Sequence, residues 1–115
     1  MFKPGDKIMV SHRKLFPNDQ QRYFTGLVDA YEHGLVKATG HSWAREPNMG
    51  EVVRKEGTRT KIFSLTAGTV MAYHLPDSVD MSHLHFEAQA WEIIITDGNY
   101  RMDLAEYVHG GELHA

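Results

Sequence analysis

The sequence predicts a small all-β protein, and two observations carry that prediction. Short segments in which apolar and polar residues alternate recur at roughly the 8–12-residue spacing typical of β-sandwiches and barrels. Gly, Pro, Asn and Asp cluster between these segments, and no strand–helix–strand unit of about 30 residues is evident. We therefore expect a single domain over residues 1–115, a small antiparallel barrel of the SH3-like or OB-like type with six or seven strands.

The first half of the chain has the clearest alternation. In Lys7–His12 and in Tyr23–Glu32, successive side chains alternate in character, as the two-residue period of a strand requires. Gly26, inside the second segment, indicates a bulge or a close approach of backbone. The residues Glu32-His33-Gly34 then predict a hairpin turn that returns through Leu35–His41.

The middle of the chain predicts three more strands, at Glu51–Arg54, Arg59–Leu65 and Thr69–Leu75. The last two are expected to form a hairpin, because only a few residues that include a glycine separate them. The segment Ser78–Ala90 is the one place where we expect a short helix. Its apolar residues fall at helical spacing after Ser78, a residue type that caps helices.

The final strand pair is predicted at Trp91–Thr96 and Asn99–Leu104. Asp97-Gly98 joins the two segments, and this residue pair is typical of two-residue hairpin loops, so Gly98 should have a positive φ. The expected core collects apolar residues from these strands, namely Ile8, Val10, Val28, Phe63, Val70, Ile94 and Met102.

Charge is divided unevenly along the chain, although the net charge is only −3. Residues 1–61 hold 11 basic and 7 acidic side chains, a net of +4, whereas residues 62–115 hold 1 and 8, a net of −7. One interpretation is that strands of opposite charge pair and neutralise each other. The other is a basic binding surface. An isoelectric point of about 6.2 disfavours nucleic acid as the partner.

Histidine and carboxylate side chains are densest between residues 74 and 87. These are ligand types for divalent transition metals, so a metal cofactor is one hypothesis. His83 and Glu87 are expected to be neighbours in a strand or in a helix, and His85 joins them in a strand. The alternative is a surface on which these residues pair with one another. The candidate metal ligands are His74, His83, His85 and Glu87.

Basic residues form a second group, which includes Arg54, Lys55, Arg59 and Lys61, with Arg13, Lys14 and Arg22 earlier in the chain. In a barrel these side chains are able to converge on one anionic ligand, such as a phosphate. The alternative is a solvated strand face. Trp43 lies in an irregular segment, where an aromatic residue has less reason to be in the core. The candidate ligand-binding residues are Trp43, Arg54 and Arg59.

One family resemblance supports the barrel. The order of Gly5-Asp6-Lys7-Ile8, a hairpin pair, Trp91-Glu92-Ile93-Ile94 and Tyr100–Leu104 resembles the small β-barrel of FomD-like nucleotide phosphohydrolases. The resemblance implies a barrel fold. It transfers no catalytic residue, because these 115 residues hold no counterpart of the carboxylate-rich C-terminal extension of those enzymes.

Three functions are compatible with these patterns. We expect first a ligand-binding or protein-interaction accessory module, with a small ligand or a protein as its partner; a homo-oligomer stays open. The alternatives are a metal-dependent hydrolase that uses the His74–Glu87 cluster and a nucleic-acid-binding barrel. The sequence has no cysteine, which excludes disulfides and thiolate metal sites. No apolar run approaches membrane-spanning length, so we expect a cytoplasmic protein without a membrane partner.

Overall fold

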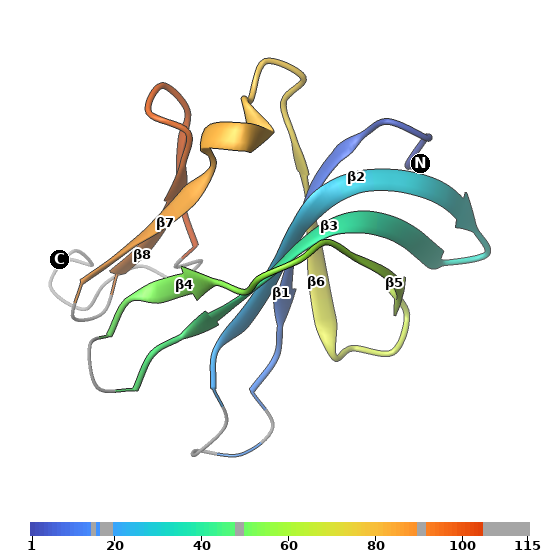
Figure 1. The fold of residues 1–115 in the computed structure, drawn as a ribbon. Helices are drawn as coiled ribbons and strands as arrows, with labels where there is room; N and C mark the ends of the chain where they lie inside the picture. The colour runs from blue at the N-terminus through green and yellow to red at the C-terminus, as the bar shows by residue number, and fades with distance from the viewer. Residues whose placement is uncertain (15, 17–19, 48–49, 90–91, 105–115) are drawn as a thin grey trace, which may run out of the picture.

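The computed structural model describes residues 1–14, 16, 20–47, 50–89 and 92–104, and these residues form β-strands and one short 3-10 helix (Figure 1). The strands are β1 (Lys7–His12), β2 (Arg22–Glu32), β3 (Leu35–Arg45), β4 (Val52–Arg54), β5 (Arg59–Ser64), β6 (Val70–Leu75), β7 (His85–Gln89), β8 (Glu92–Thr96) and β9 (Arg101–Asp103). The 3-10 helix η1 (Met81–His83) precedes β7. No helix of the described chain is long and apolar enough to cross a membrane.

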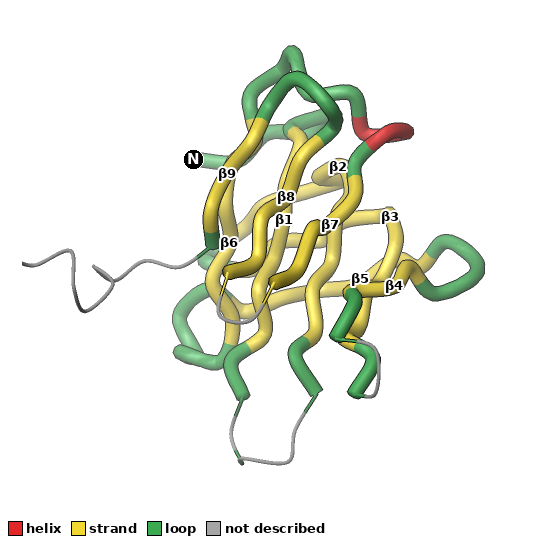
Figure 2. Tube along the Cα trace, turned by 90° about the vertical axis from the view of Figure 1, so that its left-hand side faces the viewer, coloured by secondary structure: helices red, strands yellow, loops and turns green. Residues whose placement is uncertain are grey.

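The strands form two antiparallel sheets. The larger sheet has the order β4-β3-β2-β1-β6, and β5 pairs with β3 beside β4. The smaller sheet has the order β7-β8-β9. Figure 2 shows the smaller sheet lying across one face of the larger one. The prediction of an all-β antiparallel fold is therefore confirmed, but the described residues form nine strands rather than six or seven.

The larger sheet bends where Gly26 of β2 faces Gly40 of β3. A Cβ atom at Gly40 would lie 2.5 Å from Gly26 Cα, closer than real Cβ atoms come to backbone. The close approach anticipated at Gly26 is thus real, and it involves a second glycine. The bend divides β3 between two partners, because β5 pairs with Leu35–Gly40 and β4 pairs with Trp43–Arg45.

β1, β2 and β3 each bury side chains on both faces, and the buried apolar side chains of the described residues form two clusters. One lies on the concave face of the larger sheet and consists of Ile8, Val10, Phe24, Val28, Val36, Ala38 and Phe63. The other lies between the two sheets and consists of Met9, Tyr23, Trp43, Val52, Leu75, Val79, Leu84, Phe86, Ile93 and Ile95. Of the predicted core, Val70 and Met102 are only partly buried and pack against these clusters, whereas the other five residues are buried.

The predicted barrel is not confirmed, because no pairing closes the larger sheet among the described residues. The hairpin expected between β5 and β6 is wrong. Although only a short turn separates the two strands, β5 pairs with β3 and β6 pairs with β1. The expected helix within Ser78–Ala90 is confined to the single turn of η1, after which the chain extends as β7.

The two predicted hairpin turns differ in outcome. At the β2–β3 turn, His33 and Gly34 have φ of 51° and 80°, as a two-residue turn of type I′ requires. At the β8–β9 turn, Gly98 has the predicted positive φ of 103°. The last strand pair is Thr96 with Arg101, however, so this loop has four residues rather than two.

Candidate anion-binding site

Four Lys and Arg side chains of the first half line one pocket together with His12. This pocket has a volume of about 210 Å³. Its lining contains five basic side chains together with Tyr23, Ser42 and Trp43, and no carboxylate. The basic side chains are His12, Arg22, Lys55, Arg59 and Lys61.

Strand register explains why these side chains meet. Ser42 pairs with Phe24, Lys61 pairs with Ala38 and Arg59 pairs with Gly40, so all of them lie in the rows that face the concave side. The ring of His12 meets the edge of Phe63, with 5.7 Å between ring centroids. Lys61 Nζ lies 5.8 Å from the centroid of Phe24. The aromatic residues of the concave cluster therefore lie against the His12 ring and close to the Lys61 ammonium group.

The electrostatics of the pocket are those of unbalanced positive charge. Burial lowers the pKa of His12, and the cations of Arg22 and Lys61 lower it further. Burial also lowers the pKa of Lys61, and Arg59, Arg22 and Lys55 add to the effect. Both shifts have the sign expected where like charges gather without an acidic partner. The negative charge of an anion in this pocket would oppose the lowering of both pKa values.

Ser42 contributes an unused hydrogen-bonding group. Its residue is only 8% exposed. Among the described residues, its Oγ is the one buried side-chain nitrogen or oxygen that has no hydrogen-bond partner. A buried hydroxyl without a partner costs about 1–3 kcal/mol of stability, so such groups need an explanation. A ligand that accepts a hydrogen bond from Ser42 would supply one.

The three predicted ligand-binding residues are divided between sites. Arg59 lines the basic pocket, and Trp43 contributes to its lining. Trp43 is nevertheless a core residue, because it packs against Phe86 and donates a hydrogen bond of 2.9 Å from Nε1 to Thr25 Oγ1. Arg54 lines a different pocket, of about 360 Å³, on the other face of β2 and β3 beside η1.

Of the four predicted metal ligands, only His85 and Glu87 contact each other. His74 lies on β6, with its Nε2 3.7 Å from Asp6 of the loop before β1. His83 contacts Asp80, whereas Glu87 contacts His85 at 3.4 Å and Arg101 at 3.3 Å, so the expected pairing of His83 with Glu87 is not formed. Within the described part of the chain, no three His, Asp or Glu side chains are placed to hold a metal ion.

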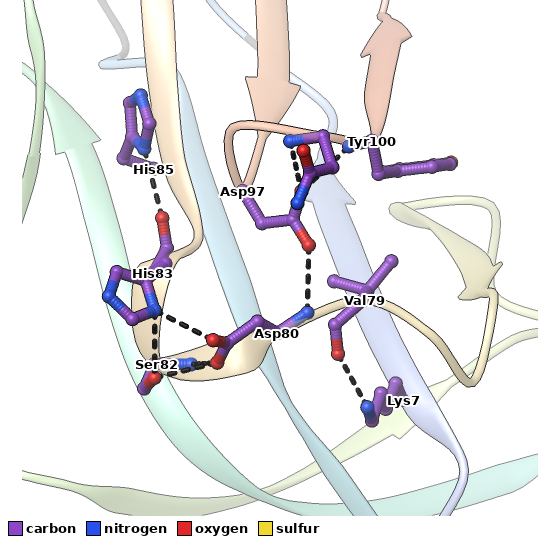
Figure 3. Close-up of polar contacts among 9 residues, drawn as sticks. Lys7, Val79, Asp80, Ser82, His83, His85, Asp97 and Tyr100 are labelled. Carbon is purple, nitrogen blue, oxygen red and sulfur yellow. Dashed lines mark hydrogen bonds and ion pairs between the residues drawn. The ribbon is translucent and has the colours of Figure 1, made fainter.

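Asp80, Ser82 and His83 instead form a hydrogen-bonded cap on η1 (Figure 3). Asp80 accepts hydrogen bonds from the backbone N–H of Ser82 at 3.0 Å and from its hydroxyl at 2.6 Å. His83 Nδ1 lies 2.7 Å from Asp80 and 3.3 Å from Ser82 Oγ. A catalytic triad needs the serine and the aspartate on different ring nitrogens. Here both lie at Nδ1, so the arrangement is a structural one.

The same region is anchored to the β8–β9 loop through Asp97 (Figure 3). The Asp97 carboxylate accepts hydrogen bonds from the backbone N–H groups of Asp80, Asn99 and Tyr100 at 2.7–2.9 Å. These bonds lower the pKa of Asp97 to about 2, with the bond from Asp80 contributing most. Lys7 also donates hydrogen bonds to the carbonyl oxygens of Asp77 and Val79. The acidic and basic residues here hold the two sheets together.

The sequence indicated most of the basic pocket but missed Tyr23, His12 and Ser42, and two members of the predicted basic group, Arg13 and Lys14, line other pockets. Arg22, Lys55, Arg59 and Lys61 belong to the predicted basic group. His12 and Ser42 carry no motif, and their positions follow only from strand parity. Each of them lies two positions from an apolar residue of its own strand and therefore shares a face with it. This alternation is the sequence signal that would identify them.

Comparisons with protein-family models, with curated proteins and with solved structures find no match.

Proposed function

We propose that this protein is a ligand-binding module whose basic pocket takes a small anion, of which a phosphate group is the best fit. The proposal is carried by one observation: five basic side chains and an unpartnered buried hydroxyl line one pocket that has no acidic residue. Two guanidinium groups offer planar pairs of donors, which suit phosphate oxygens. A single carboxylate would neutralise less of this charge.

The size of the pocket favours a compact ligand over a polymer. A volume of about 210 Å³ suits one or two phosphate groups with a small attachment. Its aromatic residues, Tyr23 and Trp43, are buried, whereas sequence-tolerant binding of single strands uses aromatic rings on which bases stack. A metal-dependent hydrolase has no support in the arrangement of the described His, Asp and Glu residues.

Calorimetric titration with inorganic phosphate and with pyrophosphate tests the proposal. We expect saturable binding of one ligand, tighter for pyrophosphate. Lys61→Gln should weaken it by about 10-fold or more, because a hydrogen bond to a charged group contributes about 1.5–3 kcal/mol. Lys37→Gln is the matched control. This variant makes the same change of charge at an exposed residue of β3. Lys37 pairs with Ile62 of β5 and does not line the pocket.

Three results would contradict the proposal. The first is that neither anion binds. The second is that the Lys61→Gln variant binds both anions with the affinity of the wild type. The third is that Lys37→Gln weakens binding as much as Lys61→Gln does. A short single-stranded oligonucleotide, titrated at several salt concentrations, distinguishes a nucleic-acid partner. Affinity for the oligonucleotide that falls steeply with salt, without any for pyrophosphate, would favour nucleic acid instead.

A further inference from the structure

We propose that the basic pocket binds its anion together with a proton, and that His12 carries this proton. The inference rests on the proposed function and adds the regulation of the same site. It predicts that ligand affinity rises as the pH falls through the neutral range, where histidine changes charge.

The surroundings of His12 contain cations on several sides and no acid. Arg22 faces it from β2 and Lys61 from β5, and Lys55 and Arg59 line the same pocket. From β3 the pocket receives the neutral Ser42, and on β6 the paired residue is the apolar Val70. Phe63 lies against the ring itself. No described group near His12 is able to balance a positive imidazolium.

The empty pocket therefore favours the neutral imidazole. Burial and the neighbouring cations disfavour the charged ring, and the pKa of His12 is accordingly lowered. A bound dianion adds two negative charges among the same groups. The attraction between these negative charges and the imidazolium then outweighs the repulsion from Arg22 and Lys61, so the pKa of His12 rises on binding. A ligand that raises a pKa must itself bind more tightly to the protonated protein, because the two equilibria are linked.

The size of the pH effect on affinity follows from the amount by which binding raises the pKa of His12. Each unit by which binding raises the pKa of His12 makes the affinity at low pH about 10-fold greater than at high pH. The affinity rises as the pH falls through the pKa of the bound state, and it levels off below the pKa of the free state. A shift of one to two units therefore predicts an increase of about 10-fold to 100-fold between about pH 8 and about pH 5.

Sulfate is the appropriate probe, because it stays a dianion over this range and any pH dependence then belongs to the protein. The affinity for sulfate is measured by calorimetry at several pH values. The His12 ring is followed by NMR during a pH titration, without sulfate and at saturating sulfate. We expect the pKa of His12 to rise by at least one unit with sulfate, and the affinity to rise about 10-fold on acidification.

Two variants assign the effect. His12→Gln should bind sulfate with little dependence on pH. His33→Gln, a change at the exposed β2–β3 turn beside Glu32, should keep the wild-type dependence. Sulfate binding that does not depend on pH, with an unchanged pKa of His12, would overturn the inference and leave the proposed function standing. A failure of sulfate, phosphate and pyrophosphate to bind at any pH would overturn both.

Discussion

Replacement of Gly40 by alanine tests the bend in the larger sheet. Gly40 has no left-handed φ, so alanine would ordinarily stabilise the protein slightly by restricting the unfolded chain, by about 0.4–1 kcal/mol. The structure predicts the opposite sign. A Cβ at this position would clash with the backbone carbonyl oxygen of Thr25 and would lie 2.5 Å from Gly26 Cα. Ordinary contact begins at 3.4 Å, so β2 and β3 must separate locally by more than about 0.9 Å.

The cost of that separation can be worked from the strand ladder. The pairs Thr25–His41, Gly26–Gly40 and Leu27–Thr39 all lie at the point of contact. Lengthening two or three of the backbone hydrogen bonds there, at about 1 kcal/mol each, destabilises the protein by roughly 2–3 kcal/mol. Misplaced side chains in the cluster around Phe24 and Val28 would add to this.

Urea unfolding followed by circular dichroism measures the change, and Gly68→Ala is the control. Gly68 has a positive φ of 77° and open space around it, so alanine there incurs only the conformational cost of about 1–2 kcal/mol. We expect Gly40→Ala to be the less stable variant of the two. A midpoint for Gly40→Ala equal to or above that of the wild type would refute the close approach of β2 and β3.

Three other changes test the network between the sheets, the core and the metal hypothesis. Asp97→Asn should flatten the acid dependence of stability. The folded pKa of Asp97 is depressed from 3.8 to about 2, so its contribution is present above pH 3.8 and is lost as the pH falls toward 2; equal acid transitions for variant and wild type would contradict this. Trp43→Phe removes the hydrogen bond to Thr25 and should lower the free energy of unfolding by about 1–2 kcal/mol in urea titrations, whereas a surface Trp43 would give no change. A strong chelator should leave the melting temperature unchanged, since the described residues form no metal site. A lower melting temperature in chelator would instead support the metal hypothesis.

Local patterns predicted the strands well, because alternation is a property of neighbouring residues. The bounds of β1 agree with the pattern of Lys7–His12, and the type I′ turn at His33-Gly34 follows from its glycine. Pairing is different, since it depends on which strands meet. The short connection between β5 and β6 favoured a hairpin, but Phe63 of β5 is buried by packing on β3 and the concave cluster. The burial of Phe63 against β3 therefore decided the pairing of β5, rather than the short connection between β5 and β6.

The candidate sites show the same division. The spacing of His83, His85 and Glu87 was compatible with one metal site in an unbroken strand. The chain turns at η1 instead, which leaves His83 outside the alternation of β7. The basic group fared better because Arg59 and Lys61 are two residues apart on one strand and so share a face. The contribution of His12 required the pairing of β1 with distant strands, which no local pattern reports.

The burial of β1 on both faces has a consequence for how the protein unfolds. Met9 belongs to the cluster between the sheets, while its neighbours Ile8 and Val10 belong to the concave cluster. Adjacent residues of one strand thus belong to the two different clusters, so both clusters depend on the backbone of β1. Loss of the smaller sheet, β7–β9, would expose one face of β1, β2 and β3, and the opposite face of the same strands carries the concave cluster. The described structure should therefore melt in one cooperative transition, with the same midpoint whichever cluster is observed.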